Sequence, residues 1–401
     1  MSASLFAGVE LAPHDPILGV TEAFNADPNP NKVNLGVGVY TDDEGKVPVL
    51  ECVRRVEQQL CETPQPRNYL PIDGLKTYDR AVQEVLFGLE STALKEGRVV
   101  TVQALGGTGG LKIGADLIRR VNPGAAIWIS DPSWENHRVI FEYARYEVNT
   151  YPYYDPETHG LKFDAMIETL DGLPAGSVVL LHACCHNPTG VDLKEDQWER
   201  VIQTVKKREL VPFLDLAYQG FADGLDADAC AVRRFGDACT AVFVSSSFSK
   251  SLSLYGERVG AFSVVTEDAS EVTKVLSQVK RVIRTNYSSP PTHGGQAVAT
   301  VLTTPELRTL WDQELGQMRD RIKTMRRQLV EKIRAIRADF DFSFVVEQRG
   351  MFSYSGLTRE QVRRLREEYS VYAIDSGRIC VAALNTRNVD YVAKAIASVL
   401  L

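Results

Sequence analysis

The sequence predicts an α/β fold, with a mostly parallel central sheet covered by helices on both faces and a second, smaller α+β domain. Through the middle of the chain, short apolar runs of strand length alternate with helical patterns, which is typical of parallel strands joined by crossover helices. The chain has 401 residues, enough for two or three domains, and its 44% hydrophobic and 24% charged residues are those of an ordinary globular protein.

The N-terminal 45 residues look irregular, because Pro13, Pro16, Pro28 and Pro30 interrupt them. An extended stretch over 33–40 follows, and then a helix whose apolar face carries Leu50, Val53, Val56 and Leu60. The strands expected after this helix are 99–104, 126–130, 178–182, 211–214, 241–244 and 260–265. Helices such as 111–121 and 197–209 fill most of the gaps between them.

The last third of the chain has a different pattern. A long charged helix is expected over 305–336, with one apolar side and a solvated face of Glu and Arg. Alternating runs at 342–346 and 350–356, a helix over 359–369 and an extended run at 378–383 predict the small α+β domain. The predicted division is therefore 1–45 as an N-terminal arm and part of the small domain, 46–310 as the large domain, and 311–401 as the small domain.

Charge and composition exclude several classes of partner. The formal net charge is −7 and no basic run is present, which argues against nucleic-acid and membrane-surface binding. No apolar run approaches the length of a membrane span, and the first basic side chain is Lys32, so we expect no targeting signal. The seven cysteines are an odd number without a CxxC pair, which favours reduced thiols and a cytoplasmic location.

Chemically useful side chains follow several predicted strands, where ligands of open parallel sheets bind. The glycine-rich segment 105–110 follows the first of these strands and could hold an anion or could be a tight turn without a ligand. The groups after the later strands are Asn187, Asp215, Tyr218, Ser247, Ser249, Lys250 and Arg258. This set suits pyridoxal phosphate, which needs a lysine for its aldehyde, a carboxylate for its ring nitrogen, donors for its phenolic oxygen, and hydroxyls and an arginine for its phosphate.

Three other interpretations fit less well. Gly107 and Gly109 begin a dinucleotide fingerprint, but Lys112 stands where the third glycine belongs, and the candidate ribose ligand Asp131 is followed at once by a proline. The 247–250 segment matches the S-x-x-K nucleophile motif, but the chain has no S-D-N and no K-T-G. Four residues resemble metal ligands, but neighbours on a strand point to opposite faces, so we predict packing roles and no metal for His182, Cys184, Cys185 and His186.

At these residues the chain resembles the class I pyridoxal-phosphate aminotransferases, in their aspartate and aromatic-amino-acid branch. The likeness covers nearly the whole chain, because it runs through long motifs in order: 15–19, 34–40, 69–74, 130–137, 185–190, 215–221, 247–250, 286–291 and 376–378. It implies catalytic roles for Lys250, Asp215 and Tyr218, with Lys250 as Schiff-base lysine and proton shuttle, and Asp215 on the ring nitrogen with His137 behind it.

The resemblance also implies the remaining site residues. Trp134 would stack on the ring, and Asn187 and Tyr218 would bind its oxygen. The phosphate would be held by Gly107, Thr108, Ser247, Ser249, Arg258 and, from a second subunit, Tyr69. The substrate would contact Gly38, Trp134 and Asn187, with Arg378 on its α-carboxylate and the partner's Arg284 on a side-chain carboxylate. Without the resemblance, Arg284 and Arg378 would pass for ordinary surface charges.

The expected reaction is ping-pong transfer of an amino group from Tyr, Phe or Asp to 2-oxoglutarate in a homodimer with shared sites. Stretches 105–109, 251–258 and 378–382 are similar to the aromatic members, whereas both arginines are common to the branch. A strict aspartate aminotransferase is therefore the alternative, and a nicotinamide-dependent dehydrogenase is the alternative of a different class. A non-catalytic binding protein is a third possibility, and the complete set of cofactor-binding groups argues against it.

Overall fold

The structure, a computed structural model, describes residues 4–11, 18–64, 66 and 68–400. Pro13, Pro16 and part of the 15–19 motif lie outside the described residues. Within the described part, the largest sheet has seven strands in the order β2-β10-β9-β8-β7-β3-β4. Its strands are β2 (Val99–Leu105), β3 (Ile127–Asp131), β4 (Val148–Pro152), β7 (Val178–His182), β8 (Val211–Leu216), β9 (Val242–Ser247) and β10 (Val259–Val265).

The predicted mostly parallel sheet is confirmed. Neighbours from β4 across to β9 pair in parallel, and only β10 runs antiparallel, to β9 on one side and β2 on the other. All six predicted strands are present. The seventh, β4, was not predicted because only two of its five residues are buried, so it lacks a continuous apolar run.

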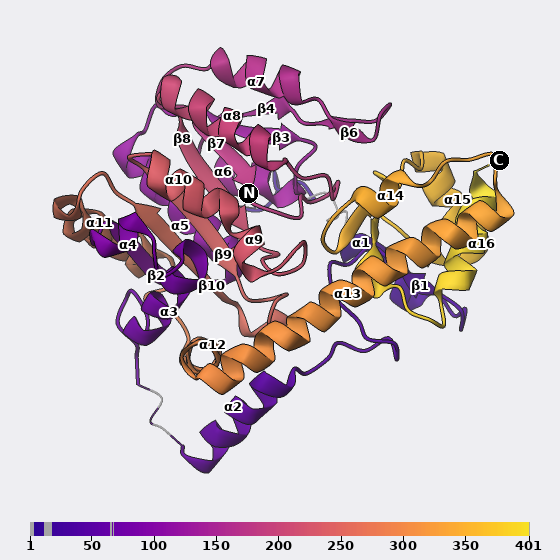
Figure 1. Ribbon diagram of the computed structural model, residues 1–401, viewed down its shortest axis with the longest axis horizontal. Helices are drawn as coiled ribbons and strands as arrows, with labels where there is room; N and C mark the ends of the chain where they lie inside the picture. The colour runs from indigo at the N-terminus through magenta and orange to yellow at the C-terminus, as the bar shows by residue number, and fades with distance from the viewer. Residues whose placement is uncertain (1–3, 12–17, 65, 67, 401) are drawn as a thin grey trace.

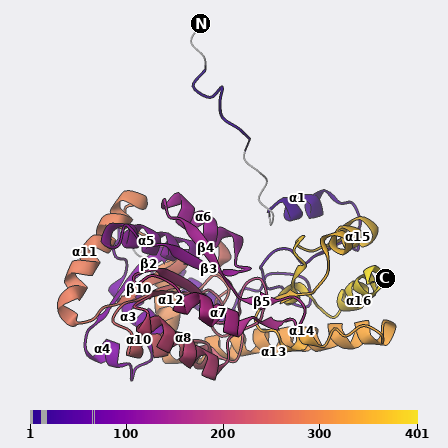
Figure 2. The same ribbon diagram turned by 90° about the horizontal axis from the view of Figure 1, so that it is seen from above.

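Helices cover both faces of the sheet (Figure 2). On one face lie α5 (Gly106–Val121), α6 (Glu135–Tyr143) and α11 (Ala269–Asn286), and on the other lie α3 (Lys76–Phe87), α7 (Phe163–Asp171), α8 (Glu195–Lys207), α10 (Cys230–Ala238) and α12 (Thr292–Thr303). The first four residues of β7 are all apolar because both faces of the strand are covered. Val178 and Leu180 pack against the helices of the first face, and Val179 and Leu181 pack against those of the second.

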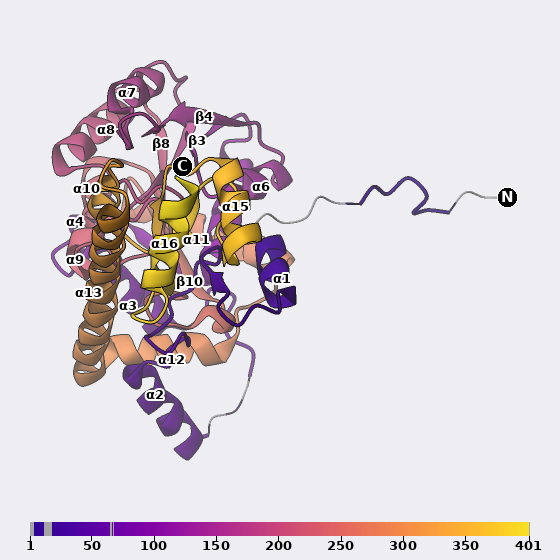
Figure 3. The same cartoon turned by 90° about the vertical axis from the view of Figure 1, so that its right-hand side faces the viewer.

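A second group of elements combines both ends of the chain. Strand β1 (Val33–Asn34) pairs in parallel with β12 (Val371–Tyr372), so the N-terminal segment lies among C-terminal elements. The group also contains α1 (Leu18–Ala26), α14 (Phe344–Glu347), β11 (Phe352–Tyr354), α15 (Arg359–Tyr369), β13 (Arg378–Cys380), η2 (Val381–Ala383) and α16 (Val389–Val399). Helix α16 packs between α15 and the long helix α13, and α1 packs against β1 and β12 (Figure 3).

Helix α13 (Pro305–Ile336) has the predicted bounds and connects the two groups. It starts beside α2 (Glu51–Glu62) and α12 and ends among α14 and α16 (Figure 1). The helix continues through residue 310 without a break. The division of the chain at residues 45 and 310 stays a prediction. Five short elements complete the described fold: α4 (Thr92–Lys95), α9 (Leu225–Asp228), η1 (Tyr255–Glu257) and the two strands of a hairpin, β5 (Tyr154–Asp155) and β6 (Gly160–Leu161).

Several expectations about local structure were wrong. The 378–383 run is extended only over Arg378–Cys380, because Val381–Ala383 form the 3-10 helix η2. Phe344 stacks on His159 inside a helical turn, so the 342–346 run is not extended. In the 33–40 stretch, only the first two residues form a strand. Arg326 lies in the supposedly solvated charged pattern of α13 but is buried, where it donates to the carbonyls of Val345 and Gly350, among others.

Candidate active site

A cavity of about 220 Å³ lies where β7, β8 and β9 end, beside the N-terminus of α5. This is the place that parallel-sheet topology favours for ligands. All the predicted site residues except Tyr69, Arg284 and Arg378 line it. The lining residues are Gly38, Gly107, Thr108, Leu111, Trp134, His182, Asn187, Asp215, Ala217, Tyr218, Ser247, Ser249, Lys250, Tyr255 and Arg258.

Lys250 supplies the cavity with an amine. It follows β9 by three residues, and its Nζ lies 5.0 Å from the ring centroid of Tyr218. Burial lowers the pKa of this amine to about 8; Arg258 and Arg378 act in the same direction, and Asp215 opposes them. The unprotonated amine, which is the form that acts as a nucleophile or a proton acceptor, is therefore far more populated near neutral pH than it is for an exposed lysine.

Asp215 supplies a carboxylate with one free oxygen. Its Oδ2 lies 2.9 Å from Nε2 of His137, and Nδ1 of His137 lies 2.9 Å from Oγ of Ser133. Burial alone would raise the pKa of Asp215, but the His137 hydrogen bond and nearby positive charge hold that pKa below its ordinary value. Oδ1 has no hydrogen-bond partner among the described residues. A buried, ionised oxygen without a partner is costly, so the site is built for a donor from a ligand.

The N-terminus of α5 forms the anion-binding side of the cavity. The glycines predicted as a loop are the first helical turn, and Gly106 has a φ of +67°. A side chain at Gly106 would collide with the guanidinium of Arg258, so glycine allows the helix end and this cation to approach each other. Arg258 also donates to Oγ of Ser249 at 3.3 Å. Helix amides, hydroxyls and a guanidinium together suit a phosphate group.

Arg378 lies beside the cavity, fully buried on β13. It donates to Oδ1 of Asn187 at 3.1 Å and to the carbonyl of Gly36 at 2.7 Å, and its guanidinium carbon lies 4.3 Å from the ring centroid of Phe352. Gly38 was predicted near this arginine; it lines the cavity, and a Cβ there would lie 2.6 Å from the Phe352 ring. Stacked on a ring and held at both terminal nitrogens, Arg378 is pre-oriented for a carboxylate.

Tyr69 and Arg284 do not join this cavity within one chain. Tyr69 is 94% exposed, and Arg284 is exposed near the end of α11, where it donates to Oγ of Ser288. An exposed tyrosine and an exposed arginine are free to contact another molecule, as the shared-site prediction requires.

Sequence reasoning missed four lining residues, Leu111, His182, Ala217 and Tyr255. His182 was predicted to be a packing residue, but it ends β7, and its Nε2 has no partner among the described residues. Burial lowers the pKa of His182 to about 3, so the ring is neutral. Tyr255 lies in the 251–258 stretch, and its hydroxyl accepts the N–H of Tyr40 at 2.9 Å. Its position in that motif was the sequence signal that could have placed it in the site.

The four residues that resemble metal ligands do not come together around one point. His182 gathers with His137 and Asp215, whereas Cys184 and Cys185 gather with Asp228. The Asp228 carboxylate already accepts three backbone N–H groups, those of Gly220, Ala222 and Asp223. This carboxylate therefore works as a structural cap, and the absence of a metal stays a prediction.

The fold and the site define an α/β enzyme whose chemistry is carried by a lysine amine and a buried carboxylate beside an anion-binding helix end. The family model described as aminotransferase class I and II matches residues 30–396. The chain belongs to this family and is an aminotransferase.

Known proteins similar to the chain carry two kinds of name. The aspartate aminotransferase of Pseudomonas aeruginosa is 59% identical, over 99% of this chain and 100% of that protein. The aromatic-amino-acid aminotransferase of Burkholderia pseudomallei, solved covalently bound to pyridoxal phosphate, is 63% identical with a TM-score of 0.98, and both chains are fully covered. The aromatic amino acid aminotransferase of Psychrobacter sp. B6, cocrystallised with aspartic acid, is 48% identical with a TM-score of 0.97, over 99% of this chain and 100% of that one.

Proposed function

We propose that the protein is a pyridoxal-phosphate-dependent aminotransferase that moves the amino group of Tyr, Phe and Asp to 2-oxoglutarate. One observation carries the proposal: a lysine amine with a lowered pKa shares a cavity with an ionised carboxylate, one oxygen of which has no hydrogen-bond partner in the part of the chain that the structure describes. An amine for the aldehyde and a carboxylate for the ring nitrogen are the two groups that this cofactor needs most.

The residues present fit the cofactor at each of its polar ends. The unpartnered Oδ1 of Asp215 suits a protonated ring nitrogen, and the α5 N-terminus with Ser247, Ser249 and Arg258 suits the phosphate. When bound, the cofactor supplies an aldehyde that takes up the amino group and a ring that withdraws electrons from the substrate Cα. Its presence in the B. pseudomallei relative supports the assignment.

The chain's own side chains then have distinct tasks. The Lys250 amine holds the cofactor and afterwards moves a proton from the substrate Cα. Asp215 keeps the proton on the ring nitrogen, and Asn187 and Tyr218 donate to the phenolic oxygen. Trp134 covers the ring, and Arg378 binds the α-carboxylate with its planar guanidinium.

The names of the similar proteins support a dual specificity. The P. aeruginosa protein is named for aspartate and the B. pseudomallei protein for aromatic amino acids, yet the matches cover 99% and 100% of this chain. The Psychrobacter protein is named for aromatic amino acids and was crystallised with aspartic acid. A site that accepts both classes of substrate fits all three, and a strict aspartate aminotransferase is the alternative.

A half-reaction tests this proposal. Purified enzyme is mixed, without any oxo acid, with aspartate, tyrosine or phenylalanine, and the visible absorbance of the bound cofactor is followed. We expect the absorbance to change with all three amino acids at comparable efficiency. A response to aspartate alone would establish the alternative. A colourless protein without this absorbance, and with nicotinamide-dependent oxidation instead, would overturn the assignment.

We also propose a homodimer in which Tyr69 and Arg284 complete the partner's site. The proposal is supported by their exposure and by their absence from this chain's own cavity. Mixed dimers test it, because a Lys250→Ala subunit and an Arg284→Leu subunit together contain one intact site.

Coexpression of the two inactive variants is expected to restore activity on aspartate to about a quarter of the wild-type level, since half of randomly paired dimers are mixed and each has one good site. Each variant expressed alone is the control. No recovery in a sample that native mass spectrometry shows to contain mixed dimers would contradict the shared site.

We further propose a cytoplasmic location, which the seven free cysteines support. None of the helices in the described part of the chain combines the length and apolar character needed to cross a membrane.

A further inference from the structure

The segment that carries Tyr69 and the helix that carries Arg284 meet at a buried carboxylate. Asp73 lies four residues after Tyr69, and Lys280 lies one helical turn before Arg284 on α11. Asp73 is only 1% exposed, and its Oδ2 lies 3.1 Å from Nζ of Lys280. The same carboxylate pairs with Lys76, at the start of α3. The contact therefore joins two segments more than 200 residues apart.

A second set of contacts joins these segments through Gln103 on β2. The N–H of Gln103 donates to the carbonyl of Asp73 at 3.0 Å, and its side-chain amide donates to the carbonyl of Pro291 at 2.8 Å. The hydroxyl of Tyr287, three residues after Arg284, donates to the Gln103 carbonyl at 3.2 Å. Gly74, with a φ of +97°, lets the chain approach the Gln103 side chain, because a Cβ there would lie 2.5 Å from it. Both segments are thus anchored to one residue of a paired strand.

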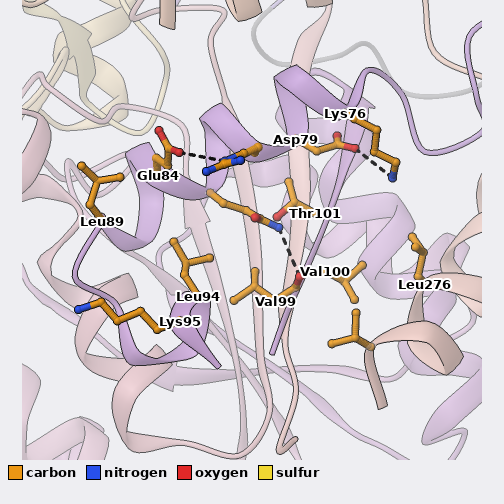
Figure 4. Close-up of a pocket in the computed structure, with 13 residues that line it drawn as sticks. Lys76, Asp79, Glu84, Leu89, Leu94, Lys95, Val99, Val100, Thr101 and Leu276 are labelled. Carbon is orange, nitrogen blue, oxygen red and sulfur yellow. Dashed lines mark hydrogen bonds and ion pairs between the residues drawn. The ribbon is translucent and has the colours of Figure 1, made fainter. Parts of the chain in front are cut away.

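Charge is concentrated on Asp73 and not on its neighbour. Asp79 also pairs with Lys76, at 3.8 Å, and lines a cavity of about 480 Å³ between α3, α4, β2 and α11 (Figure 4). Burial raises the pKa of Asp79 to about 8, and the charge of Asp73 adds to this. Burial opposes the ionisation of Asp73 too, but the bonds from Lys76 and Lys280 hold its pKa below the ordinary value. At neutral pH, Asp73 is therefore the charged partner of both lysines.

We propose that Asp73 is a positioning residue for the shared active site, because its buried contact with Lys280 fixes Tyr69 and Arg284 relative to each other. The inference rests on the proposed function, since it takes these two residues to act in the partner's site. It goes further in assigning their alignment to Asp73, Lys280 and Gln103, none of which reaches the cavity of its own chain. Tyr69 and Arg284 would then enter the partner's site as parts of one rigid unit.

Two variants test this role. Asp73→Asn keeps the size and the backbone bond but removes the charge, and Lys280→Met removes the other partner at a position that tolerates change because its side chain is 37% exposed. We expect either change to raise the KM for aspartate and 2-oxoglutarate about tenfold. The kcat/KM for phenylalanine should fall by less than about threefold, because the Tyr69 contact is common to both substrates whereas phenylalanine has no side-chain carboxylate for Arg284 to bind. Lys274→Met, at an exposed lysine of the same helix, is the matched control.

Amide hydrogen exchange provides a readout that does not depend on turnover. In the cofactor-free protein, exchange in peptides covering 68–76 and 284–291 should speed up in both variants, while peptides of β8 stay unchanged. The double variant should resemble each single variant, because the two side chains act through one contact. Purely additive effects on KM, or unchanged exchange in both segments, would overturn the proposal.

Arg284→Leu separates this inference from the proposed function. If Arg284→Leu raises the KM for aspartate and Asp73→Asn does not, Asp73 has no positioning role and the shared site stands. If Arg284→Leu leaves that KM unchanged, the proposed role of Arg284 fails, and the positioning role of Asp73 fails with it.

Discussion

Lys250→Ala is expected to lower kcat by about 10⁴-fold, because it removes the group that moves the proton at the substrate Cα. A loss of this size corresponds to ~5.5 kcal/mol of activation free energy. The Lys250 amine already has a lowered pKa of about 8, so it is poised for this task near neutral pH. The measurement is the single-turnover rate with aspartate and with phenylalanine, at saturating pyridoxal phosphate.

The same variant is expected to fold normally. The surroundings of Lys250 disfavour its charged form, so removing the amine should cost the native state little free energy. The thermal midpoint should therefore not fall. Circular dichroism and the thermal midpoint are therefore the controls, and Lys274→Met provides an exposed lysine for comparison. A folded Lys250→Ala protein that keeps wild-type turnover would disprove the catalytic assignment.

Local sequence patterns predicted most of the fold. Strands such as β7 are buried on both faces, so their apolar runs stand out from the surrounding sequence. Helix α13 was predicted over its whole length because its apolar residues repeat on one side. Elements fixed by distant contacts were not predictable. Phe344 enters a helical turn where it stacks on His159, and Arg326 is buried because carbonyls of a distant segment receive its N–H groups.

The candidate site was predictable to the extent that its residues follow parallel strands. Asn187, Asp215 and Lys250 converge because the carboxyl ends of β7, β8 and β9 share one edge. The free Oδ1 of Asp215 could not be read from the sequence, because it depends on where His137 places its ring. Arg284 has no local signal that distinguishes it from a surface charge, and its expected role came from the family resemblance.

Asp215→Asn is expected to lower kcat by about 10²- to 10³-fold. The asparagine keeps the size of the side chain but not the negative charge that holds a proton on the ring nitrogen. The loss should appear in kcat with little change in the KM for either amino acid, because Asp215 is not expected to contact the substrate. Asp215→Glu retains the charge and should lose less than Asp215→Asn does. Half-reaction rates of both variants, measured with the cofactor bound, compare the two changes directly.

Asp228 makes a matched control, because its carboxylate is as buried as that of Asp215, at 4% and 5% exposed. Its oxygens are fully used by backbone N–H groups, whereas Asp215 leaves Oδ1 free. Asp228→Asn should therefore reduce the free energy of unfolding by about 1–3 kcal/mol and leave kcat unchanged. Asp215→Asn should do the reverse, with a large loss of kcat and a small change in stability. Equal losses of kcat in the two variants would mean that burial of a carboxylate, and not its free oxygen, accounts for the effect at Asp215.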